Sequence, residues 1–153
     1  MNLQLYIYNC GNCGNTFKSP ELPGDPYGEF LMHSVNGEIA YLSSFKDAVF
    51  QEIESFFERS ELLNNMDKIN RVKIFHNIFG VACDPASDSS NYQIGRDPRC
   101  PKCHSNNKLS WHPTNPPEII DMQINLVTHN NWNKLNQNQK EEILNNAIKS
   151  FFK

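Results

Sequence analysis

Two C-x2-C motifs stand far apart in the chain, and they restrict its fold more than any other feature of the sequence. The first contains Cys10 and Cys13, and the second contains Cys100 and Cys103. Each motif holds two sulfurs close enough for one metal ion, and amides of the turn can hydrogen-bond the thiolates. The sequence therefore predicts a tetrahedral four-cysteine site for a structural Zn²⁺. The same four sulfurs would also accept iron, because ligand type alone does not separate the two metals.

A single C-x2-C motif is also typical of thioredoxin-like redox pairs. Two motifs, each flanked by Gly or Pro, favour one closed metal site over redox chemistry or unliganded thiols. The arrangement CGNCG…CPKCH resembles zinc-ribbon and rubredoxin-like knuckles over residues 5–18 and 98–112, although His104 stands where those knuckles often have glycine. The resemblance implies a zinc ribbon with a long insertion, since residues 14–99 separate the two motifs.

Short runs of β-forming residues predict strands at 3–8, 15–18 and 108–111. Asn36-Gly37 lies between two further runs, which indicates a β-hairpin with a two-residue type I′ turn. With such a turn, four side chains share one face that we expect to be buried: Phe30, Met32, Ile39 and Tyr41. The segment from Glu118 to Val127 is either a strand or a mixed segment.

Three stretches have helical periodicity. The first follows a sequence from Ser44 to Asp47 that resembles a capping box, and its apolar residues lie one helical turn apart: Phe45, Val49, Ile53, Phe56 and Phe57. The second covers residues 67–79 and ends at Gly80, with these side chains expected inward: Ile69, Val72, Phe75 or His76, and Phe79. The third covers about 137–152, where Asn136 is the expected N-cap and an apolar stripe runs along one side.

Together these elements predict a single α+β domain over residues 1–153 that a zinc ion stabilises. The ribbon halves are expected at about 3–18 and 98–127, and the inserted hairpin and helices at about 29–80. A C-terminal helix at about 137–152 completes the fold. Cys83 follows an apolar run and is expected to be a small buried residue.

The sequence does not indicate an enzyme, although a site assembled from loops stays open. It contains no H-E-x-x-H, no His-x-Glu of the zinc deaminases, no phosphate-binding loop and no nucleophile elbow. A closed four-cysteine site also has no open coordination position for a substrate. We therefore expect the metal to be structural.

The preferred functional prediction is non-catalytic binding to another protein, as in a neutralising, immunity-type protein or an adaptor. The net charge of −3 gives no general attraction to nucleic acid or to an anionic membrane. Acidic residues of the first predicted helix could meet a basic partner, although they could equally form an ordinary solvated face: Glu52, Glu54, Glu58 and Glu61.

The alternative is a nucleic-acid-associated zinc ribbon with a regulatory or processing role. Basic and aromatic residues near the second motif would supply its binding patch: Arg96, Arg99, Lys102, Lys108 and Trp111. These cations could equally offset the charge of the thiolates. The N-terminal residues lack a signal-peptide pattern, and no apolar run approaches the ~20 residues of a membrane helix. Together with metal-binding thiols, these features predict a cytoplasmic protein.

Overall fold

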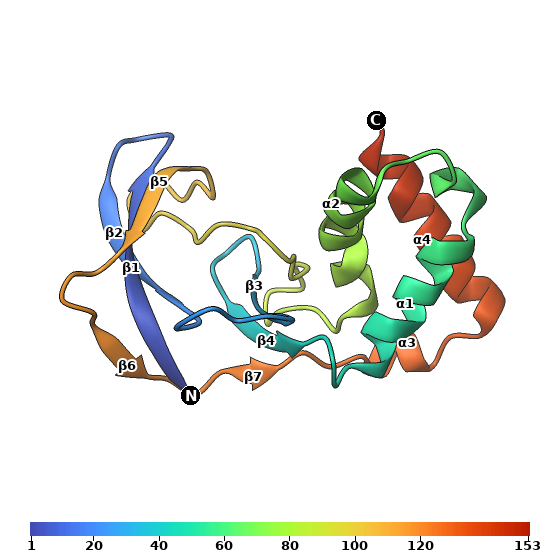
Figure 1. Cartoon of the computed structure of the whole chain (residues 1–153), viewed down its shortest axis with the longest axis horizontal. Coiled ribbons are helices and arrows are strands. Elements are labelled where there is room, and N and C mark those ends of the chain that lie inside the picture. The colour runs from blue at the N-terminus through green and yellow to red at the C-terminus, as the bar shows by residue number, and fades with distance from the viewer.

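The computed structural model describes all 153 residues and contains two small β-sheets and a group of helices. Figure 1 shows one sheet at the end of the molecule that carries the N-terminus, the second sheet in the middle, and the helices at the opposite end. Helices and sheets are both present, as the predicted α+β class requires. No helix combines the length and the apolar character needed to cross a membrane.

The first sheet is built around β1, Asn2–Cys10. On one side β1 pairs with β2, Thr16–Glu21, and on the other side with β5, Lys108–Pro113, and β6, Ile119–Asp121. All three pairings are antiparallel. The predicted strands at 3–8, 15–18 and 108–111 are thus confirmed. The β1–β5 pairing brings the two cysteine motifs to the same end of the sheet.

The second sheet contains a hairpin of β3, Glu29–His33, and β4, Ile39–Ser43. Its loop has three residues, 35–37, closed by a hydrogen bond of 2.9 Å from Ser34 N to the carbonyl oxygen of Glu38. Within this loop only Gly37 has a positive φ, of 90°, whereas a type I′ turn needs two such residues. The predicted two-residue turn is therefore wrong.

The extra loop residue shifts the strand register by one position, which reverses the face of every side chain on β4. Phe30 lies opposite Leu42 and Met32 lies opposite Ala40, and this face packs on the helical core. Ile39 and Tyr41, which were expected on the same face, point to the other side of the sheet.

The segment from Glu118 to Val127 contributes to both sheets. Its first part is β6, which pairs with β1. Its second part is β7, Asn125–Leu126, which pairs in parallel with β4. The segment therefore connects the two sheets, a role that neither of its two predicted descriptions included.

The helices are α1 (Ala48–Arg59), α2 (Lys68–Ile78), the short α3 (Asn130–Asn133) and α4 (Gln137–Phe151), with 3-10 turns η1 (Glu61–Leu63) and η2 (Phe79–Ala82). The predicted C-terminal helix is confirmed, including a capping box between Asn136 and Gln139. Helix α1 begins later than predicted, because Asp47 is its N-cap. Phe45 consequently lies outside the helix and is exposed.

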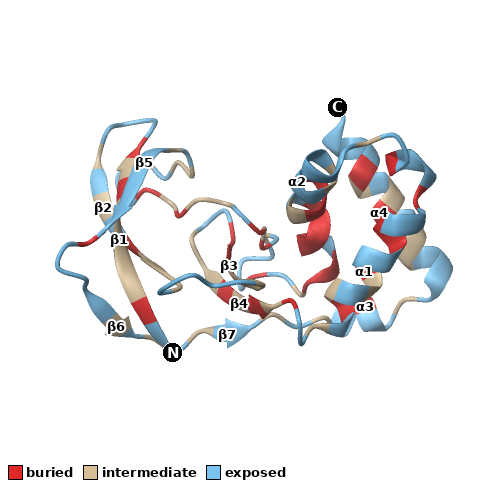
Figure 2. Ribbon diagram, viewed as in Figure 1, coloured by how far each residue is buried: buried red, intermediate tan, exposed pale blue.

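The main hydrophobic core lies between the hairpin and the helices. Its largest fully buried side chains come from β3, β4, α1, α2, η1, η2 and α4: Met32, Leu42, Ile53, Leu63, Ile74, Phe79 and Ile148. Figure 2 shows the buried residues on the inward sides of α1, α2 and α4. Helix α2 faces this core through Ile74 and Phe75, whereas Ile69 and Val72 are exposed, contrary to prediction. Cys83 is buried in the core as expected.

Candidate metal centre

The four predicted ligands lie together at the end of the first sheet. The sulfurs of Cys10, Cys13, Cys100 and Cys103 are all within 4.8 Å of one another. Cys10 Sγ is 3.5 Å from Cys103 Sγ, and Cys13 Sγ is 3.7 Å from Cys100 Sγ. A tetrahedron with metal–sulfur bonds of about 2.3 Å has edges of about 3.8 Å. The sulfurs are thus spaced as one tetrahedral metal ion requires.

The two cysteine motifs have the same backbone geometry. In the first, Cys10 N donates to the carbonyl oxygen of Asn15 (2.9 Å), and Gly14 N donates to that of Cys10 (3.0 Å). In the second, Cys100 N donates to the carbonyl oxygen of Ser105 (2.8 Å), and His104 N donates to that of Cys100 (2.9 Å). Each turn therefore closes by the same two hydrogen bonds.

The equivalence extends to the fifth residue of each turn. Gly14 has φ of 76° and His104 has φ of 68°, so both adopt the left-handed conformation. This conformation costs little for glycine but is strained for a residue with a Cβ atom. His104 therefore takes the place of the glycine that the first motif has, and its side chain is exposed.

Two interactions join the motifs to each other through the sheet. Cys10 is the last residue of β1 and pairs with Lys108 at the start of β5, next to a register shift. Gly11 N then donates to the carbonyl oxygen of Asn107 at 2.7 Å. A Cβ atom on Gly11 would lie 3.1 Å from the Asn107 side chain, so glycine permits this close approach.

The surroundings of the sulfurs favour the anionic form at some positions and oppose it at others. A hydrogen bond from the Asn12 side chain and one from the Ser105 backbone lower the pKa of Cys103 to about 6. For Cys13, a backbone hydrogen bond from Asn15 lowers the pKa, but burial and the three neighbouring thiols raise it to about 11. Four thiolates this close together need a cation to balance their charge, and a bound divalent metal would provide it.

The predicted basic patch does not form one free surface. Arg96 donates to the backbone oxygens of His33 and Asn91, and Arg99 donates to the Asn36 side chain at 3.1 Å. These contacts tie both guanidinium groups to neighbouring loops.

The other members of the predicted basic patch lie at the β5 side of the site. The Lys108 ammonium is 3.1 Å from Asp97 and 4.5 Å from the ring of Trp111. Trp111 also stacks on Tyr6 and Tyr8, with ring centroids 5.0 and 5.9 Å apart. Among the predicted cations, Lys102 alone is exposed without a polar contact to a side chain.

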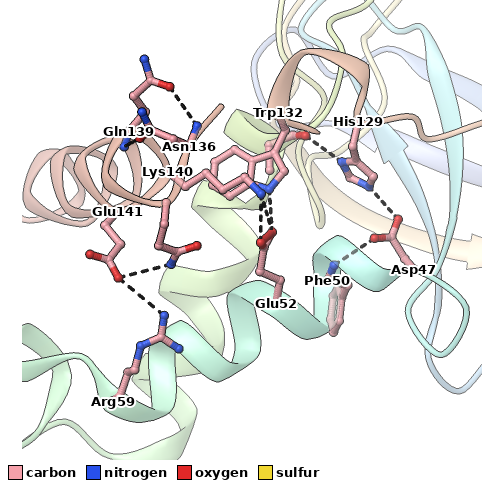
Figure 3. Close-up of polar contacts among 12 residues, drawn as sticks. Asp47, Phe50, Glu52, Arg59, His129, Trp132, Asn136, Gln139, Lys140 and Glu141 are labelled. Atoms are coloured by element: carbon pink, nitrogen blue, oxygen red, sulfur yellow. Dashed lines mark hydrogen bonds and ion pairs between the residues drawn. The ribbon is translucent and has the colours of Figure 1, made fainter. Parts of the chain in front are cut away.

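The four residues of the predicted acidic face have different surroundings. The Glu52 carboxylate accepts a hydrogen bond of 2.8 Å from Trp132 Nε1 and lies 3.1 Å from Lys140 Nζ. Figure 3 shows this carboxylate directed between the two side chains, toward α3 and α4. Glu52 therefore joins α1 to α3 and α4, and its side chain is partly exposed. Glu54, Glu58 and Glu61 remain exposed.

Two histidines have environments that the sequence did not indicate. His129 joins three segments: its Nδ1 lies 2.6 Å from the Ala82 carbonyl oxygen, and its Nε2 lies 2.7 Å from Asp47 Oδ2 (Figure 3). Because both partners accept hydrogen bonds, both contacts are hydrogen bonds only when each ring nitrogen carries a proton, so this geometry favours the imidazolium form. His33 is the opposite case. It is 3% exposed, and neither of its ring nitrogens has a hydrogen-bond partner.

No protein-family model matches the chain, and no curated protein or solved structure matches it either. What the protein does must therefore be inferred from its cysteine site and its surfaces.

Proposed function

We propose that the four cysteines bind a structural Zn²⁺ in a zinc-ribbon arrangement, and that the protein acts by binding another protein without catalysing a reaction. The sulfur spacing carries the first part, because the four atoms lie within 4.8 Å of one another on two equivalent turns. Four thiolates complete the coordination of Zn²⁺ and leave no position for a substrate. Zinc is preferred to iron as a redox-inert ion suited to a structural site.

A groove between α1 and α2 is the surface that best fits a protein partner. It has a volume of about 240 Å³, and Phe57, Val72 and Phe75 contribute apolar walls. Glu54 and Glu58 line the α1 side and have no ion-pair partner in the chain. Lys68 and Arg71 line the α2 side of the same groove. A partner that carries an apolar side chain next to a basic one would fill the groove and neutralise these carboxylates.

The exposed residues of α2 extend this surface. Ile69 is 71% exposed and Val72 is 43% exposed, whereas the buried side of the helix carries Ile74, Phe75 and Ile78. Helix α2 therefore presents apolar side chains to solvent beside the acidic wall of α1. An immunity-type protein or an adaptor needs such a surface, and the structural metal would take no direct part in it, because the metal stabilises the first sheet.

The test combines metal analysis with binding to a purified partner. Native mass spectrometry of the full chain is expected to find one Zn²⁺, lost in Cys103→Ser. Chains that copurify from the native host are then purified, and their affinity is measured for wild type and for Glu58→Lys. We expect the charge reversal to weaken binding about tenfold or more.

Glu142→Lys is the matched control, since Glu142 is an exposed carboxylate on α4. This variant should bind as wild type does. Equal weakening by both substitutions, or by neither, would show that the groove is not the interface. A zinc-loaded protein with no partner in its host would refute the binding function while leaving the metal site intact.

A further inference from the structure

The four cysteines of the metal site are not equally accessible. Cys10 and Cys100 are buried, with 2% and 0% of their surface exposed, and Cys103 is partly buried. Cys13 is exposed. A molecule in solvent that reacts with sulfur would therefore reach Cys13 before any other ligand. The fifth cysteine, Cys83, is buried in the helical core.

Backbone amides donate to the sulfurs of both motifs in the same way. In the first motif, Asn12 N donates to Cys10 Sγ at 3.3 Å. The backbone amide of Asn15 donates to Cys13 Sγ. The amides at the equivalent positions 102 and 105 donate to the two sulfurs of the second motif. Backbone hydrogen bonds therefore do not distinguish the exposed sulfur from the others.

Side-chain amides do distinguish the two motifs. Asn12 and Asn15 belong to the first motif, but their carboxamides are directed at sulfurs of the second. The Asn12 side chain donates to Cys103. Asn15 Nδ2 lies 3.9 Å from Cys100 Sγ, which is a long hydrogen bond to sulfur. No side-chain N–H or O–H group donates to Cys13.

These differences determine how each sulfur reacts once the metal is bound. All four ligands are then thiolates, so their reactivity depends on access and on the nucleophilicity of each sulfur. A hydrogen bond that stabilises a thiolate also makes it a weaker nucleophile. Cys13 is the most exposed of the four and lacks the side-chain donor that both sulfurs of the second motif have.

We propose that Cys13 is a modification site at which soft electrophiles, such as α,β-unsaturated carbonyl compounds, open the metal site. The proposal rests on the four-thiolate Zn²⁺ site proposed above and adds a reactivity to it. Cys13 Sγ attacks the β-carbon of the electrophile, so that an S–C bond forms and the C=C π bond breaks. The α-carbon takes a proton from water. The product is a neutral thioether, and the three remaining thiolates hold Zn²⁺ less tightly.

The two carboxamides keep this reaction at one sulfur. Cys103 is the only other ligand that is not fully buried, so its hydrogen bond from Asn12 matters most. Asn15 acts on Cys100, which burial already protects. Removal of the Asn12 carboxamide is therefore the change that should spread the reaction to a second ligand.

N-ethylmaleimide is a suitable probe of this class. The full chain is loaded with Zn²⁺, and native mass spectrometry verifies that one ion is bound. A limiting amount of the reagent is added, and peptide mass spectrometry locates the adducts. The first adduct is expected at Cys13, with none at Cys83. Zn²⁺, read with a chromogenic chelator, should be released in step with this adduct and not in a sample without the reagent.

Asn12→Ala is expected to raise the rate of Cys103 modification about threefold to tenfold, because a hydrogen bond to a charged group is lost. Asn107→Ala is the matched control. Asn107 is an exposed carboxamide beside Gly11, and it has no hydrogen bond to a sulfur. This variant should react as wild type does.

Three results obtained with Zn²⁺ verified in place would overturn the proposal and leave the metal site intact. The first is an initial adduct at a cysteine other than Cys13. The second is an adduct at Cys13 without release of Zn²⁺. The third is the same Cys103 rate in Asn12→Ala and Asn107→Ala, which would show that the carboxamide does not protect this sulfur. A chain that binds no Zn²⁺ would instead refute the proposed metal site, and this inference with it.

Discussion

Removal of the metal is expected to unfold the first sheet and to leave the helices folded. The strands of this sheet bury only two large apolar side chains, Leu3 and Tyr8. Their burial stabilises the sheet by about 3–6 kcal/mol. The twenty-residue core, in contrast, contains no residue of β1, β2, β5 or β6. The two parts of the molecule therefore depend on different interactions.

The metal contributes more than this apolar burial. Structural Zn²⁺ sites are worth about 10–16 kcal/mol in small peptides. A cross-link that closes a loop of the size between Cys13 and Cys100 lowers the entropy of the unfolded chain by an amount worth about 4–5 kcal/mol on its own. Both the metal-binding energy and the loop-closure energy are as large as the stabilisation from burying Leu3 and Tyr8, or larger. The first sheet should therefore not persist without the metal.

Hydrogen–deuterium exchange read by mass spectrometry can test this. Metal-free protein, prepared with a chelator and verified by native mass spectrometry, should lose protection in β1 and β5 but keep it in α1 and α4. Cys103→Ser should behave in the same way. Cys83→Ala is the matched control, since Cys83 is buried in the helical core and is not a ligand. Unchanged protection of β1 in verified metal-free protein, or simultaneous loss in α1 and α4, would refute this reasoning.

Three further predictions concern stability. Burial alone would lower the pKa of His129, but its hydrogen bonds to Asp47 and to a backbone carbonyl raise it. The contribution of His129 to the free energy of unfolding is therefore fully present below about pH 6.5 and is lost as pH rises through the folded-state pKa. His129→Gln should lower the free energy of urea unfolding at pH 6 by about 2 kcal/mol and remove this pH dependence. Residues 14 and 104 both have a left-handed backbone, which is strained in a residue with a Cβ atom. Gly14→Ala should therefore destabilise the metal-loaded protein by about 1 kcal/mol, and His104→Gly should raise its Tm. A lower Tm for His104→Gly would contradict this reasoning. Glu52→Gln weakens the hydrogen bond from Trp132 and removes the ion pair with Lys140. Thermal unfolding should show that the free energy of unfolding falls by about 1–2 kcal/mol. An unchanged Tm would mean that these contacts add nothing to the packing of the helices.

The cysteine cluster and the C-terminal helix could be predicted because each depends on local chemistry. Two C-x2-C turns specify their own sulfur geometry, and the sequence needs only to bring the turns together. The capping box at Asn136 and Gln139 likewise involves neighbouring residues. Such features are encoded within a few positions of the chain.

The predictions for the hairpin loop and for the buried face of α2 were wrong because contacts between residues far apart in the chain determine both. Asn36-Gly37 allows both a two-residue and a three-residue loop, and the choice determines which residues of β4 face the core. In α2, apolar residues occur on more than one side. Packing of this helix against α4 and against Phe50 and Phe57 of α1 selects Ile74 and Phe75 for the interior and leaves Ile69 exposed. The contact between Glu52 and Trp132 could not be predicted, because the two residues are eighty positions apart in the chain.

The position of the inserted hairpin and helices between the two cysteine motifs has a consequence for synthesis on the ribosome. Cys10 and Cys13 are translated about ninety residues before Cys103, an interval of about 5–20 s. During that interval the nascent chain offers only two of the four ligand sulfurs until Cys100 is made, so it can hold a metal ion weakly or lose it to other thiols. Strand β1 also lacks its neighbour β5 throughout this time. The metal-binding half of the protein therefore begins first and is completed only after the α1–α2 segment has been made, so its folding depends on metal being available late in translation.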